Sequence, residues 1–303
     1  MEWLENKVII PLSITLIGYT DMPLDYPIDF IKSLKSEHRS IIATICDIEN
    51  QSGGPGNLQS SIEKLNRTTD ILFSHLEKED KILYPVLMGS TETRKLAKKY
   101  SYDMERLSCI ALDFFKRYCI NKEGLRIFIE DFINGYSLFS GLLKMRIKRE
   151  EMELYPSFIL LESGVLSSEV LQYVQEKETL KSDNEKRILI FGKDEPYLKA
   201  LELALEICGL KVYSTNSLTE ITSISETTKP DLILLDITKS NKELRDLVVH
   251  LKEQVKNSVQ LFGYSTSESY PIEEKIEKSL DAFIPQVAIN METLSEKVKK
   301  VLS

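Results

Sequence analysis

The chain has 303 residues, of which 42% are hydrophobic and 28% charged, so it can bury the cores of two soluble domains. Its formal net charge of -8 argues against general nucleic-acid binding, which needs clustered lysines and arginines to displace counterions from phosphates. Its four cysteines form neither a C-x-x-C pair nor a disulfide framework, which favours a reducing, cytoplasmic location.

An N-terminal arm is expected over residues 1–26. Its apolar run, from Val8 to Tyr19, is interrupted by Pro11 and is too short to span a bilayer. We therefore expect a packed arm and no membrane association.

Residues 27–177 predict an all-α domain. Apolar residues recur at three- and four-residue steps from Ile28 to Ile45, which predicts an amphipathic helix with His38 in its buried stripe. Further helices are predicted over 58–83, 92–118 and 123–153. Four long helices with short connections predict an antiparallel, up-down four-helix bundle, in which metal sites are built from side chains of facing helices.

The polar stretch 178–186 predicts a linker, and the periodicity changes after it. Within residues 187–303, short apolar runs alternate with amphipathic segments, which predicts a doubly wound, flavodoxin-like parallel sheet. Its five predicted strands cover residues 187–191, 211–214, 231–236, 261–264 and 282–284. Functional groups of such a sheet lie at the carboxyl ends of its strands.

One phrase occurs twice in the helical part, first as HLEKEDKILYP (75–85) and then as RIKREEMELYP (146–156). Each copy places a carboxylate, Glu79 or Glu150, four residues after a long polar side chain, which puts both on one helix face. His75 and Glu79 predict half of a metal site. Arg146 stands where the first copy has histidine, and a guanidinium has no lone pair to offer a metal.

The order of His38 and the two phrases, with their Leu-Tyr-Pro endings, resembles the hemerythrin-like (HHE cation-binding) family over about residues 27–160. The resemblance implies a four-helix bundle that holds two irons between histidines of all four helices and two bridging carboxylates. By position, it assigns His38 and His75 as ligands and Glu79 and Glu150 as bridges.

Two ligand positions of that pattern are replaced, by Met104 in the third helix and by Arg146 in the fourth, so a conventional di-iron site is not expected. In one interpretation, the remaining imidazoles and carboxylates hold a single Fe(II), Zn(II) or Mn(II) ion. In the other, no metal binds, and Arg146 pairs with Glu79 or Glu150 in a dry core.

The first strand with Asp194 and Glu195 after it, and Asp236 at the end of the third strand, resemble the receiver domain of response regulators over residues 187–303. The resemblance implies that Asp194 and Glu195 bind Mg2+ and that Asp236 accepts a phosphoryl group, whose oxygens a lysine neutralises. Gln286 stands at the lysine position. This replacement favours a degenerate receiver that serves as an interaction or dimerisation module.

The sequence therefore predicts a non-enzymatic regulatory protein that acts through protein partners and without nucleic acid. A homodimer is one of the assemblies it allows. One alternative is a metal-dependent sensor or binder of iron, oxygen or nitric oxide that uses the reduced His/Glu site. The other is a phosphorylatable response regulator. No nucleophile-base arrangement supports an enzyme, since the chain has only three histidines.

Overall fold

The computed structural model describes residues 26–51, 57–120, 129–164, 185–238, 242–255, 259–265, 274–284 and 291–302. The predicted arm up to residue 25 and residues 178–184 of the predicted linker lie outside this set. The described residues fall into two compact units, one drawn from 1–129 and 147–175 and the other from 130–146 and 176–303.

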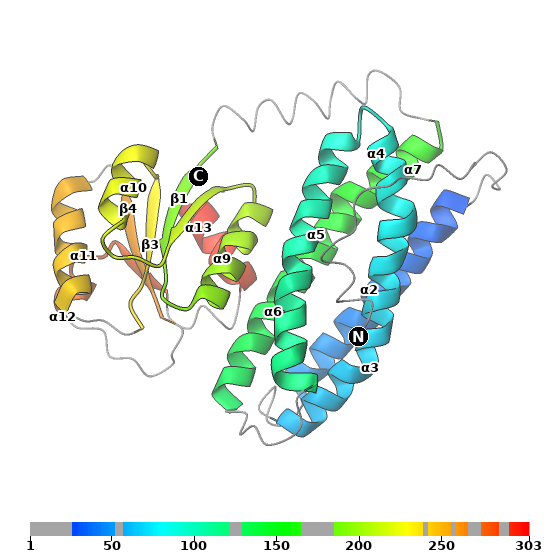
Figure 1. Ribbon diagram of the computed structural model, residues 1–303, viewed down its shortest axis with the longest axis horizontal. Coiled ribbons are helices and arrows are strands. Elements are labelled where there is room, and N and C mark those ends of the chain that lie inside the picture. The colour runs from blue at the N-terminus through cyan, green and yellow to red at the C-terminus, as the bar shows by residue number, and fades with distance from the viewer. Residues whose placement is uncertain are drawn as a thin grey trace. The chain divides into compact units, whose positions relative to one another are not determined.

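Four helical runs make up the helical part of the described chain (Figure 1). They are α2 (Tyr26–Asn50); α3 (Leu58–Lys78) with η3 (Glu79–Leu83) and α4 (Tyr84–Gly89); α5 (Arg94–Phe115) with η4 (Lys116–Ile120); and α6 (Ile129–Arg149) with η5 (Glu150–Leu154) and α7 (Tyr155–Glu162). The predicted helical N-terminal part is confirmed.

Side-chain contacts show that α2 and α3 run antiparallel. The His38 and His75 Nε2 atoms lie 3.0 Å apart, and the Thr68 hydroxyl donates to Thr44 Oγ1 at 3.0 Å. Residue numbers thus decrease along α3 in the direction in which they increase along α2. This pairing places the two histidines of the predicted site opposite one another.

A π-helical turn begins at the carboxylate of each repeated phrase, η3 at Glu79 and η5 at Glu150. The apolar period predicted uninterrupted α-helix at both places. A π-turn inserts one extra residue into the helical ladder and occurs frequently at functional sites. Each π-turn ends at the leucine of Leu-Tyr-Pro, and the following α-helix begins with the tyrosine and tolerates proline in its first turn.

The Leu-Tyr pairs of both phrases enter one hydrophobic core, together with residues of α2 and α5. Its buried members are Phe30, Ile31, Leu34, Leu83, Tyr84, Leu87, Ala97, Tyr100, Leu154, Tyr155 and Phe158. The repeated phrase therefore has a packing role as well as a polar one.

We expect Leu34→Ala to lower the free energy of unfolding of the helical unit by about 2–5 kcal/mol, because Leu34 is fully buried and its removal leaves a cavity. Ile28→Ala on the same helix is the matched control, since Ile28 is 45% exposed. Denaturation followed by circular dichroism measures both. Equal losses in the two variants would contradict the assigned core.

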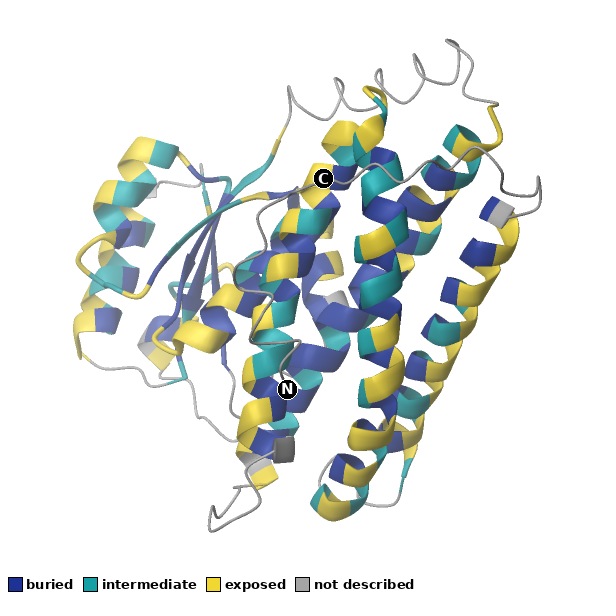
Figure 2. Ribbon diagram, turned by 45° about the vertical axis from the view of Figure 1, so that its right-hand side comes forward, coloured by how far each residue is buried: buried dark blue, intermediate teal, exposed yellow. Residues whose placement is uncertain are grey.

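The α/β unit contains a five-stranded parallel sheet in the order β2-β1-β3-β4-β5. The strands are β1 (Arg187–Phe191), β2 (Lys211–Thr215), β3 (Leu232–Asp236), β4 (Gln260–Tyr264) and β5 (Ala282–Ile284). This confirms the predicted sheet. Residues of β1 and β3 are almost completely buried, as Figure 2 shows, which explains their continuous apolar sequence.

Helices cover both faces of the sheet (Figure 1). They are α9 (Glu195–Ile207), α10 (Ile221–Thr228), α11 (Lys242–Val255), α12 (Glu274–Glu277) and α13 (Met291–Leu302). Residues of α10, α11 and α12 share a core with one face of β1, β3 and β4. Helices α9 and α13 contact one another on the other face. The fold is thus doubly wound.

None of the described helices combines the length and apolar composition that crossing a membrane requires.

Candidate metal centre

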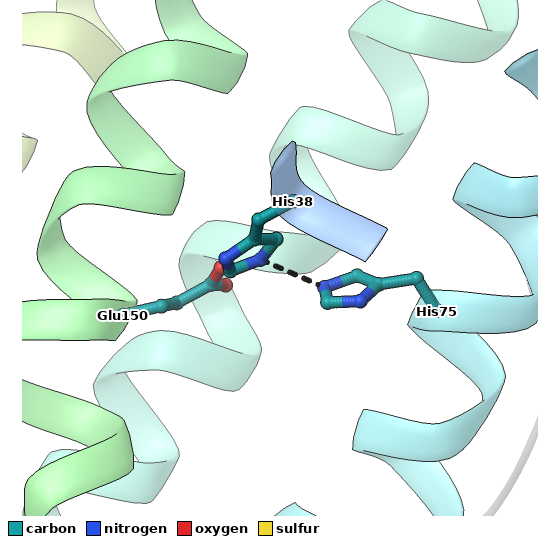
Figure 3. A group of neighbouring side chains, drawn as sticks. All are labelled: His38, His75 and Glu150. Atoms are coloured by element: carbon teal, nitrogen blue, oxygen red, sulfur yellow. Dashed lines mark hydrogen bonds and ion pairs between the residues drawn. The ribbon is translucent and has the colours of Figure 1, made fainter. Parts of the chain in front are cut away.

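Three buried side chains from three helical segments converge in the helical unit: His38 of α2, His75 of α3 and Glu150 of η5 (Figure 3). One ligand atom from each lies within 4.8 Å of the others. The predicted ligands His38 and His75 and the predicted bridge Glu150 are therefore brought together.

The His38 Nε2 atom is the centre of this cluster. It lies 3.0 Å from His75 Nε2 and 3.3 Å from Glu150 Oε2. Two nitrogens that share one ion at about 2.1 Å are about 3.0 Å apart at a right angle and about 3.4 Å apart in a tetrahedron. The observed spacing therefore suits two ligands of a single metal ion.

A second layer of carboxylates fixes both imidazole rings. His38 Nδ1 donates to Glu151 Oε1 at 2.9 Å, and His75 Nδ1 donates to Glu37 Oε2 at 3.1 Å. The direction follows because an ionised carboxylate only accepts hydrogen bonds. A neutral ring held in this way presents the lone pair of Nε2 toward the other ring. Carboxylate–histidine pairs of this kind orient metal-binding imidazoles.

The two facing Nε2 lone pairs need a cation between them, either a metal ion or an additional proton on one ring. The neighbouring Tyr155 phenol does not supply that proton, since it donates to Glu79 Oε1 at 3.0 Å while its oxygen lies 3.1 Å from His38 Nε2. The donor set of imidazole nitrogens and carboxylate oxygens fits a divalent transition metal.

Glu79, the other predicted bridge, is buried beside the cluster, with Oε1 at 3.7 Å from His75 Nε2. It is not among the three converging ligand residues, and it accepts the Tyr155 hydrogen bond. The structure thus places Glu79, predicted as a bridge, in contact with Tyr155 and His75.

Tyr155 is a member of this site that sequence reasoning missed. Its ring stacks on His38 with centroids 5.4 Å apart. Burial, the charges of Glu79 and Glu150, and the hydrogen bond to Glu79 raise the pKa of Tyr155 well above its ordinary value. The phenol therefore stays protonated near neutral pH unless a cation binds beside it.

Glu37 and Glu151 were also missed, although both lie next to predicted residues in the sequence. Burial opposes ionisation of Glu37, but hydrogen bonds from His75 and Lys78 and the charges of these residues outweigh it, so the pKa of Glu37 is lowered. The sequence signal that could have identified them was adjacency: Glu37 directly precedes His38, and Glu151 directly follows Glu150.

The two replaced ligand positions are both buried, Met104 in α5 and Arg146 in α6. Next to Met104, Asp103 accepts from Arg149 Nη1 at 3.1 Å, so a cross-helix ion pair forms between α5 and the end of α6. Arg146 is 1% exposed and stands one helical turn before Glu150.

Comparison with protein families identifies the helical part. Residues 29–158 match the family model of the hemerythrin HHE cation binding domain. This segment is hemerythrin-like. The match includes both repeated phrases and the three converging residues. No curated protein that was compared matches the chain.

Several solved structures are similar to the C-terminal part of the chain. A CheY-like receiver domain from Methanospirillum hungatei JF-1 is 24% identical, with 39% of this chain and 94% of that chain covered and a TM-score of 0.35. HP1043, an orphan response regulator of H. pylori, is 18% identical, with coverage of 40% and 98% and a TM-score of 0.35. A Thermotoga maritima response regulator is 18% identical, with coverage of 39% and 98% and a TM-score of 0.34.

The strand order 2-1-3-4-5 of this chain's own sheet is the order of CheY-type folds, so the α/β unit is receiver-like. A hemerythrin-like domain followed by a receiver-like unit supports a regulatory or sensor protein.

The residues predicted to form the receiver site differ in burial and in their hydrogen-bond partners. Asp236 ends β3 and is half-buried, with Oδ1 accepting from the Thr238 backbone at 2.9 Å. Asp194 caps α9 by accepting from the Tyr197 backbone at 3.0 Å. Glu195 is exposed and pairs with Lys199 at 2.7 Å. Gln286 lies outside the described residues.

We expect Glu37→Gln to weaken metal binding by the hemerythrin domain about 10–100-fold, the range for loss of a partner that orients a metal-binding histidine. Glu77→Gln is the control, since Glu77 lies on the same helix as His75, is 44% exposed and pairs with Lys81. Competition with a chromogenic chelator measures both affinities. Equal affinities of the two variants would show that Glu37 does not orient the ligand.

Proposed function

We propose that this protein is a metal-responsive regulator whose hemerythrin domain binds one divalent cation through His38, His75 and Glu150. The observation that carries the proposal is the pair of Nε2 atoms at 3.0 Å, each aimed by a carboxylate on its own Nδ1. Such an arrangement is unfavourable without a cation and favourable around one.

Charge supports one metal ion rather than two. Glu79 and Glu150 are both buried carboxylates, and buried negative charge requires nearby positive charge. Arg146 brings a permanently charged guanidinium to the position one turn before Glu150, where the fourth-helix histidine of the family pattern would stand. In this proposal, Arg146 replaces the charge of a second ion, and the two histidines hold the first.

The donor set suits Fe(II), Zn(II) or Mn(II), and the ion bound in the cell follows from geometry and availability. If the ion is iron, oxygen or nitric oxide are the ligands it would sense. We propose protein–protein interaction as the output, through the receiver-like unit, and no catalysis.

A metal-free regulator is the second candidate, and the burial of Arg146 favours it. In that protein, Arg146 would balance the buried carboxylates, and an additional proton would lie between His38 and His75. Both candidates are regulators, and they differ in metal content alone.

Titration of the chelator-treated full chain with Fe(II), under anaerobic conditions, and with Zn(II) and Mn(II) tests the proposal. One equivalent of at least one of these ions should bind, as measured by elemental analysis after gel filtration. Binding of two equivalents would contradict the role given to Arg146. Binding of none would leave the metal-free regulator.

A further inference from the structure

Two buried tyrosines, Tyr197 and Tyr264, lie at the end of the sheet where a receiver-like fold binds ligands. In a sheet of order 2-1-3-4-5, ligands bind beyond the carboxyl ends of β1 and β3, where the strand order reverses. The described residues that follow or end these strands are Gly192 to Glu195 after β1, and Asp236 to Thr238 at the end of β3. What fills this crevice decides whether a cation or a phosphoryl group can enter it.

Tyr264 reaches across this crevice. It ends β4 and is the register partner of Asp236 in β3. Its hydroxyl donates to the Phe191 carbonyl oxygen of β1 at 3.2 Å. Because β3 lies between β4 and β1, a side chain that starts on β4 and bonds β1 must cross the carboxyl end of β3. The Tyr264 ring is therefore buried over the strand end that carries Asp236.

Gly192 leaves space for the side chain of Tyr264. A β-carbon at position 192 would lie 2.7 Å from the Tyr264 hydroxyl oxygen, closer than such contacts allow. Glycine directly after β1 thus makes room for the Tyr264 hydroxyl, two residues before the acidic neighbours Asp194 and Glu195. The sequence and the crevice fit one another.

A second tyrosine closes the crevice from the helix side. Tyr197, in the first turn of α9, stacks on Tyr264 with ring centroids 5.9 Å apart. Burial, followed by the charges of Asp236 and Asp194, raises the pKa of Tyr197 well above its ordinary value, and the same two carboxylates act on buried Tyr264. Both phenols therefore stay neutral beside the acidic groups.

We propose that Tyr264 closes the receiver crevice, so that Asp236 takes neither Mg2+ nor a phosphoryl group and the receiver-like unit keeps one conformation. Mg2+ needs oxygen ligands at about 2.0–2.1 Å and retains several of its waters, and a buried aromatic ring leaves no space for that shell. The inference concerns the α/β unit and is independent of metal binding by the hemerythrin domain.

Beryllium fluoride, a phosphoryl analogue that binds carboxylates together with Mg2+, tests the proposal on the full chain by fluorine NMR. The natural protein should give no protein-bound fluoride resonance. Tyr264→Ser should give a Mg2+-dependent bound resonance that a further Asp236→Asn change removes. Tyr213→Ser is the matched control, since Tyr213 is a half-buried tyrosine on the edge strand β2, and it should behave as the natural protein does.

A bound resonance in the natural protein that Asp236→Asn removes would overturn the proposal, as would a folded Tyr264→Ser protein without any bound resonance. The metal content of the hemerythrin domain, measured on the same samples, separates this result from the outcome for His38 and His75.

A second measurement covers the case in which Tyr264→Ser does not fold. Gly192→Ala should lower the melting temperature of the natural protein, because the new β-carbon meets the Tyr264 hydroxyl. In a Tyr264→Phe background, the same change should cost at most half as many degrees, since the clashing oxygen is gone. Equal losses in both backgrounds would show that the hydroxyl does not fill the crevice in solution, and would overturn the proposal.

Discussion

His75→Ala is expected to abolish stoichiometric metal binding by the hemerythrin domain. The change removes one of two imidazole ligands and leaves His38 Nε2 with Glu150 Oε2 at 3.3 Å as the remaining close donor pair. A ligand that binds only the folded state stabilises it by about 4 kcal/mol at a thousand-fold excess over its dissociation constant. The natural protein should therefore lose thermal stability on chelation, and His75→Ala should not respond.

His250→Ala is the control for this experiment, because His250 is an exposed histidine of α11 in the receiver-like unit. It removes an imidazole from the chain without touching the candidate site. Elemental analysis and melting curves with and without chelator measure the effect. A His75→Ala protein that retains one equivalent of metal and its chelator response would rule out the three-residue site.

Part of the candidate site was predictable because spacing along a helix fixes which side chains share a face. The repeated phrase placed His75 and Glu79 on one face, and the apolar stripe placed His38 inside the first helix. The helical period gave these positions, and the second copy of the phrase placed Glu150 in the same register. Their roles as metal ligands and bridges came from the resemblance to the hemerythrin-like family.

The residues that orient the site were not predictable in this way. Glu37 and Glu151 are neighbours in sequence of His38 and Glu150, and consecutive helical positions point in different directions. Glu37 reaches His75 on another helix, and Glu151 reaches His38. These contacts depend on how the helices pair, which a single sequence does not specify. The π-turn that precedes Tyr155 also lies outside a regular period.

In the receiver-like unit, the strands were predictable from their apolar runs. The position of Tyr264 across the carboxyl ends of the strands was not. The sequence singled out Asp194, Glu195 and Asp236 as an acidic site, but Asp194 caps a helix and Glu195 pairs with Lys199. Tyr264 lies in an apolar strand and carries no sequence signal of its own. Its role depends on the strand order, which sets what it must cross to reach β1.

Arg146→Ala is expected to be strongly destabilising. Arg146 is 1% exposed, and removal of one partner of a buried ion pair typically costs about 3–5 kcal/mol. Lys148→Ala is the matched control, since Lys148 is an exposed cation two residues further along the same helix. Chemical denaturation of the metal-free proteins measures both. A loss no larger than that of the control would show that Arg146 does not balance Glu79 and Glu150.

Arg146→His separates the charge of the side chain from its metal-binding capacity. A histidine four residues before Glu150 recreates the spacing of His75 and Glu79 in the second phrase. We expect metal binding to rise from one equivalent to two, because the variant removes a permanent cation and adds a nitrogen ligand. Elemental analysis after loading with Fe(II) measures this change. If the variant still binds one equivalent, replacing Arg146 with a ligand has opened no second site. That result would contradict the proposal that Arg146 excludes a second ion.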